Sequence, residues 1–103
     1  MVIGMRRGTT PTHIFETDTD LTAAEVIYLT YRQDNENLLE LTGDRIDVYA
    51  DRIEVTLTQE ETLAFKPNKT VYIQIRARYA DDSAIASNVI ETTSQVILKD
   101  EVI

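Results

Sequence analysis

Cysteine is absent from this sequence of 103 residues, and glycine and histidine are scarce, at three and one. Without cysteine the chain has no disulfides, no thiolate nucleophile and no cysteine-ligated zinc site. Three glycines leave no glycine-rich loop that could cradle a phosphate. The single histidine, His13, cannot supply the two or three ligands of a histidine metal site. We therefore expect no cofactor, and we expect His13 to be a strand histidine with ordinary hydrogen bonds.

A catalytic set is also missing. A serine nucleophile would need His13 as its base, and none of the three serines lies in a nucleophile elbow. Acidic residues cluster around 18–20, 44–51 and 81–82, but none of these clusters follows the spacing of a calcium-binding EF-hand loop. Aspartate is a common turn residue, because its side chain bonds to nearby backbone amides. We expect a protein that is not an enzyme and holds no metal.

No apolar run approaches the roughly 20 residues that a membrane-spanning helix needs. Arg6 and Arg7 are not followed by an apolar stretch, so the sequence does not predict a secretory signal. The net charge of −8 repels phosphate backbones, which makes nucleic acid a poor partner. Apolar residues make up 43% and charged residues 27%, a composition typical of a single globular domain at this length.

The clearest pattern lies in Thr70–Ala80, where apolar and polar residues alternate over eleven positions. A period of two predicts a strand with one buried and one solvated face. Tyr72 is the one large apolar residue on the otherwise polar face. We expect this strand to be central, with the following residues facing the core: Val71, Ile73, Ile75, Ala77 and Tyr79.

Similar alternation predicts further strands. Residues 25–33 place Ile27, Leu29 and Tyr31 on one face, and residues 52–57 alternate as cleanly. Shorter strands are expected at 12–17, which follows Pro11 and so belongs at a sheet edge, at 38–41, at 46–48, and at 85–98 with a bulge near 87–88.

The period changes after residue 57. Thr58 and Glu61 fit a capping box, in which each side chain bonds the backbone amide of the other, and Pro67 ends the helix that follows. The predicted fold is therefore all-β: an immunoglobulin-like antiparallel β-sandwich of six to seven strands with one short helix near residues 58–64. We expect a flexible basic arm over residues 1–9, a single sandwich domain over 10–98, and a loose tail over 99–103.

Tyrosine and arginine are common at protein interfaces, and several lie on the outward faces of predicted strands that could pair with each other. Cross-strand pairing on a solvated face is the alternative. The candidate interface residues are Arg6, Arg7, Tyr28, Tyr72, Gln74, Arg76 and Arg78.

The opening segment Met5–His13 (MRRGTTPTH) resembles the start of small structural proteins encoded among tail genes of bacterial prophages. The resemblance continues through Leu29–Tyr31, Ile53–Thr62 and Val71–Arg76. It implies that Met5 is the natural start and that residues 1–4 are an upstream extension. The order of strands and short helix also resembles, more weakly, the N-terminal sandwich of phage baseplate upper proteins.

This resemblance implies a virion-associated structural protein of the tail or baseplate region, present in the bacterial cytoplasm before assembly. Its partners would be other phage structural proteins and further copies of itself, with no nucleic acid and no membrane. The alternative is a non-catalytic carbohydrate- or surface-binding module that uses Tyr28, Tyr49 and Tyr72 as stacking platforms.

Overall fold

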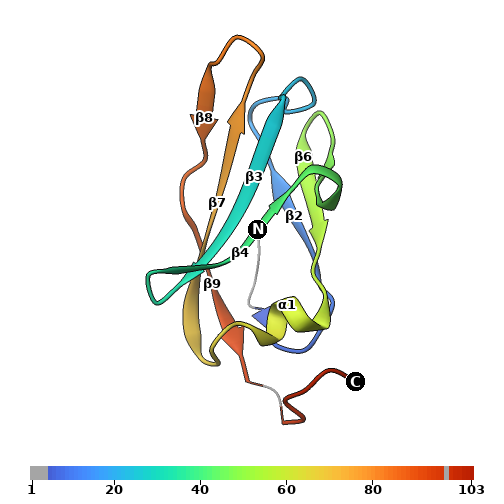
Figure 1. Cartoon of the computed structure of the whole chain (residues 1–103), viewed down its shortest axis with the longest axis vertical. Helices are drawn as coiled ribbons and strands as arrows, with labels where there is room; N and C mark the ends of the chain where they lie inside the picture. The colour runs from blue at the N-terminus through green and yellow to red at the C-terminus, as the bar shows by residue number, and fades with distance from the viewer. Residues whose placement is uncertain (1–4, 97) are drawn as a thin grey trace.

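Two β-sheets face each other across one hydrophobic core in the computed structural model, which describes residues 5–96 and 98–103 (Figure 1). The larger sheet has the order β1-β9-β7-β3-β4, and β8 also pairs with β7. The smaller sheet has the order β2-β6-β5. The larger sheet consists of β1 (Met5–Arg6), β3 (Val26–Gln33), β4 (Glu36–Thr42), β7 (Lys69–Arg78), β8 (Ala84–Ala86) and β9 (Ile90–Gln95), and the smaller of β2 (Thr12–Glu16), β5 (Asp47–Val48) and β6 (Arg52–Thr56).

The predicted all-β, immunoglobulin-like sandwich is confirmed, and β7 is its central long strand. The alternation in β3, β6 and β7 sorts their side chains as expected. The inward residues are buried: Ile27, Leu29, Tyr31, Ile53, Val55, Leu57, Val71, Ile73, Ile75 and Ala77. The described residues form nine strands rather than six or seven, because the two-residue strand β1 is too short to show a period and the predicted strand 85–98 is divided into β8 and β9.

The short helix is α1 (Gln59–Leu63), and a 3₁₀ turn (Gly43–Arg45) lies between β4 and β5. The predicted capping box is present. The Glu61 amide donates to Thr58 Oγ1 at 3.2 Å, and the Thr58 amide donates to Glu61 Oε1 at 2.8 Å. These bonds satisfy two amides that an α-helix cannot pair within itself.

The predicted bulge near residues 87–88 is confirmed: β8 and β9 both pair with β7, and their registers (Ala86 opposite Arg76, Ile90 opposite Ile73) differ by one extra residue. The segment is not one continuous strand, because the ladder is interrupted there. Residues 87–89 leave the ladder, and Ser87 holds the break in place. The Ile75 amide donates to Ser87 Oγ at 3.0 Å, and the Ser87 amide donates to the Ile75 carbonyl at 2.8 Å. The serine hydroxyl thus replaces a backbone carbonyl, which lets the chain change its path without leaving the amide unpaired.

The flexible arm predicted for residues 1–9 is wrong for its described part, residues 5–9, while residues 1–4 lie outside the described residues. Met5 is buried, and β1 pairs in parallel with β9, so the sandwich is not wholly antiparallel. Arg7 is 8% exposed. Its Nε donates to the Phe65 carbonyl at 2.5 Å and its Nη2 to the Leu63 carbonyl at 2.9 Å. The guanidinium therefore closes the C-terminal end of α1.

The tail after β9 is tied to the domain rather than loose. Asp100 Oδ2 accepts from Arg7 Nη1 at 2.5 Å. The Ile103 amide donates to Gln59 Oε1 at 2.8 Å, and Gln59 Nε2 donates to the Ile103 carbonyl at 3.2 Å. The tail ends beside α1 (Figure 1). Because both contacts lead to α1, the helix joins the two ends of the described chain.

Candidate functional site

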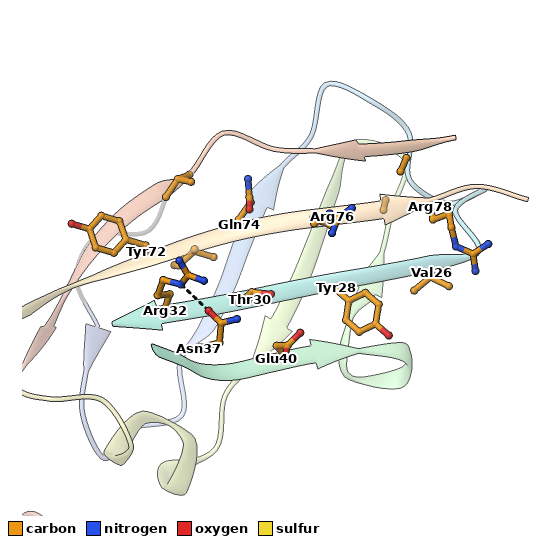
Figure 2. A pocket seen from close by; sticks show the side chains of 14 residues that line it. Val26, Tyr28, Thr30, Arg32, Asn37, Glu40, Tyr72, Gln74, Arg76 and Arg78 are labelled. Atoms are coloured by element: carbon orange, nitrogen blue, oxygen red, sulfur yellow. Dashed lines mark hydrogen bonds between the residues drawn. The ribbon is translucent and has the colours of Figure 1, made fainter. Parts of the chain in front are cut away.

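The solvated face of the larger sheet forms an open groove of about 620 Å³ over β3, β4, β7 and β8 (Figure 2). Its side chains come from alternate positions of antiparallel strands, so they stand on one face in cross-strand rows. Five predicted interface residues line this groove: Tyr28, Tyr72, Gln74, Arg76 and Arg78.

The other two predicted interface residues lie outside this groove. Arg7 is buried against the end of α1 and cannot meet a partner. Arg6 lies in β1, exposed at the edge of the larger sheet and away from the groove, and its Nη1 donates to the Val96 carbonyl at 2.8 Å. The prediction of a basic tether at Arg6–Arg7 is therefore wrong for Arg7.

The groove also includes residues that the candidate interface omitted. The most informative is Arg32, whose Nε donates to Asn37 Oδ1 at 2.8 Å (Figure 2). Arg32 has the same parity in β3 as Tyr28, so the alternation alone could have identified it. The others that carry polar or apolar contact surface are Val26, Thr30, Asn37, Glu40, Ala84 and Val89.

The charges of the groove are unevenly paired. In the part of the chain that the structure describes, neither Arg32 nor Arg76 lies within salt-bridge distance of a carboxylate. Arg78 meets Glu25 at 3.3 Å and Asp82 at 3.4 Å, both exposed. Exposed pairs of this kind hold a side chain only weakly. A protein of net charge −8 thus presents a locally cationic, tyrosine-bearing face.

Gln74 lies at the middle of the groove, and its side chain is fixed. Its Nε2 donates to the Ser87 carbonyl at 3.0 Å, at the break between β8 and β9. Across the strand pair, Thr30 lies opposite Gln74. Thr30 is shorter than the tyrosines and arginines around it, and Gln74 is held to the side, so the centre of the face is hollow and its corners project.

Tyr49 lies elsewhere, which contradicts the proposed platform of three tyrosines. It follows β5 on the smaller sheet, and its ring is covered by the Arg52 guanidinium at 4.1 Å. Tyr28 and Tyr72 are the members of that set that share a face.

His13 lies in β2, as expected, but it is a core residue. Its Nδ1 shares a 2.6 Å hydrogen bond with the Tyr31 hydroxyl, and its ring stacks on Tyr31 with centroids 5.8 Å apart. Its Nε2 is buried without a partner in the described residues. Burial lowers the pKa of His13, and burial, with a smaller effect from Glu61, raises the pKa of Tyr31 well above its usual range. Both groups are therefore neutral near pH 7.

This burial predicts a pH dependence of stability. The unfolded chain takes up a proton at the ordinary histidine pKa of 6.5, whereas the folded chain resists it. Protons therefore favour the unfolded state, and the free energy of unfolding should fall as the pH drops below about 6.5. Glu61, whose pKa is lowered first by hydrogen bonds from Arg45, titrates only under more acidic conditions.

Urea titrations followed by circular dichroism between about pH 7 and pH 5 measure this slope. His13→Gln should remove it, because the chain has no other histidine. An unchanged slope in the variant would mean that some other group titrates.

Within residues 5–96 and 98–103, no three histidine, aspartate or glutamate side chains are grouped closely enough to hold a metal ion. None of the helices in this part of the chain has the length and apolar character to cross a membrane.

No protein-family model matches this chain, and no curated protein sequence matches it. Among solved structures, the V domain of amphioxus IgVJ-C2 aligns with 91% of this chain and with all of its own, at 13% identity and a TM-score of 0.37. At that level of similarity nothing about binding or activity passes from that domain to this one.

Proposed function

We propose that this chain is a non-catalytic attachment protein of a phage or prophage particle, in its tail or baseplate region. It acts through protein–protein contacts made by the outer face of the larger sheet. It accumulates in the bacterial cytoplasm before assembly and is a component of the virion afterwards.

The observation that carries the proposal is the composition of the groove. Tyr28, Tyr72 and Arg76 project from the face, and these residue types are enriched where protein surfaces meet. Arg32 and Arg76 lack carboxylate partners in the described residues, so a partner can engage them without first breaking an ion pair. The groove is open on the outer face of the sheet, which suits a docking surface better than a site for catalysis.

The assignment to a phage particle is supported by the resemblance of Met5–His13 to the start of prophage structural proteins. A role in binding carbohydrate has less support, because Tyr49 does not share the face with Tyr28 and Tyr72.

The test uses particles released from the source bacterium after prophage induction. A double variant, Tyr72→Ser with Arg76→Glu, should fall to about a tenth or less of wild-type incorporation, measured by quantitative mass spectrometry of purified particles. The matched control is Tyr49→Ser with Arg6→Glu. It makes the same two changes outside the groove, and Tyr49 is exposed to the same extent as Tyr72, 42% against 41%.

Wild-type protein that never co-purifies with particles would contradict the phage assignment. Equal loss in the groove variant and the control would contradict the role of the groove. Circular dichroism of each purified variant shows that the fold is retained.

A further inference from the structure

The groove repeats one pattern on its two central strands. β3 carries Tyr28, Thr30 and Arg32 outward, and β7 carries Tyr72, Gln74 and Arg76 outward. Both strands thus read tyrosine, polar residue, arginine at every second position. No sequence period links them, because the two triplets are 44 positions apart.

The antiparallel register turns this repeat into a symmetric surface. Tyr28 lies opposite Arg76, Thr30 opposite Gln74, and Arg32 opposite Tyr72. Tyrosines and arginines therefore alternate at the four corners, as Figure 2 shows for the labelled side chains. A half turn about the normal of the sheet, through the Thr30–Gln74 pair, exchanges the two tyrosines and the two arginines.

We propose that a second copy of this chain binds this face, about a two-fold axis parallel to β3 and β7. The inference rests on the proposed function, which makes the face a docking surface, and it names the partner. In a two-fold contact, every pair of residues that meets across the interface occurs twice, once in each direction. A surface made of Tyr–Arg pairs in register fits that rule.

With this axis, each cross-strand row of one copy lies against the same row of the other copy, with the order of its residues reversed. Tyr28 then meets Arg76 of the other copy, and Tyr72 meets Arg32, so the dimer forms four tyrosine–arginine stacks. An arginine over an aromatic face is favourable, and more so once water is excluded. Each row also extends one strand further on either side. The complete rows are Thr42–Tyr28–Arg76–Ala86 and Asn37–Arg32–Tyr72–Glu91.

The same reversal avoids contacts between like charges. Glu91 falls on Asn37 of the other copy, and Glu40 falls near Ser87 at the break after β8. A two-fold axis perpendicular to the strands would instead place Glu40 on Glu40 of the other copy. Two copies of net charge −8 repel each other overall, so they meet best where unpaired arginines reduce the local negative charge.

An exchange of residues tests both the partner and the axis. Tyr28→Arg alone puts arginine on arginine twice in the dimer, and Arg76→Tyr alone puts tyrosine on tyrosine twice. Each should weaken dimerisation about tenfold or more. The double variant Tyr28→Arg with Arg76→Tyr restores both stacks and should return the dissociation constant close to the wild-type value. Sedimentation equilibrium of the purified chain over a range of concentrations measures all four proteins.

The control is Tyr49→Arg, which adds the same charge on the smaller sheet and should leave dimerisation unchanged. Urea midpoints confirm that every variant is folded. A wild-type chain that stays monomeric at every concentration would overturn the inference, and so would a double variant that is no better than its single parents.

The two proposals fail separately. A monomeric chain that still enters particles through this face would retain the proposed function, with a different protein, one that offers carboxylates to Arg32 and Arg76, in the groove. A dimer with the expected exchange behaviour that never enters particles would overturn the proposed function alone.

Discussion

Replacing Arg7 by methionine is expected to lower the free energy of unfolding by about 3 kcal/mol, which corresponds to a fall of roughly 10–25 °C in the melting temperature. Methionine keeps most of the buried volume, so the loss reports the guanidinium. Its removal leaves the Leu63 and Phe65 carbonyls at the end of α1 without their donors, and frees Asp100. A buried acceptor without a donor costs more than the hydrogen bond was worth.

Arg6 provides the control, because it is the adjacent residue and the same amino acid. It is exposed and makes a single hydrogen bond to the Val96 carbonyl, so Arg6→Met should change stability by about 0.5 kcal/mol or less. Arg7→Lys should recover only part of the loss, since an ammonium cannot reproduce the fork that bonds two carbonyls. Thermal denaturation followed by circular dichroism compares the three variants. If Arg7→Met matched the Arg6 control, the guanidinium would not hold the helix.

Replacing Gln33 by leucine is expected to cost about 2–4 kcal/mol, although leucine is apolar and the site is 1% exposed. The Gln33 amide joins three parts of the fold. Its Oε1 accepts from the Lys66 amide at 2.5 Å, and its Nε2 donates to the Lys66 carbonyl and to Ser94 Oγ, each at 3.0 Å. Ser94 Oγ also donates to the Lys66 carbonyl. Leucine would leave the partly buried Lys66 amide without its acceptor.

A double-mutant cycle separates this network from simple loss of packing. Ser94→Ala alone removes one member, and the double variant Gln33→Leu with Ser94→Ala should cost clearly less than the sum of the single variants, because they share the Lys66 carbonyl. Urea unfolding curves give the three values. Additive losses would show that Gln33 and Ser94 act independently.

The alternation of side chains made the faces of β3, β6 and β7 predictable, because burial of one face leaves a period of two in the residues themselves. The capping box at Thr58 and Glu61 was also predictable from the sequence, since both residues lie within one helical turn. These are local signals. They fixed which residues look inward and where the one helix begins.

The remaining features depend on distant parts of the chain. Nothing in the adjacent pair Arg6–Arg7 says which arginine turns inward, because that choice is made by β9 and α1, which are far along the chain. The slip in the alternation places an extra residue near Ser87, but the bond from the Ile75 amide to the Ser87 hydroxyl is a contact between strands that this local signal does not contain. The alternation already places Arg32 on the same face as Tyr28, but its position opposite Tyr72 depends on the register between β3 and β7, which no local pattern sets.

The parallel pairing of β1 with β9 has a mechanical consequence. Because these two strands run in the same direction, pulling the two ends of the chain apart stretches the β1–β9 hydrogen bonds along the strands and loads them together. In an antiparallel pair at the same place, the same pull would load the hydrogen bonds one after another, so they would break singly. When both ends of the chain are pulled, the β1–β9 pair can therefore carry the tension before the other strands of either sheet separate.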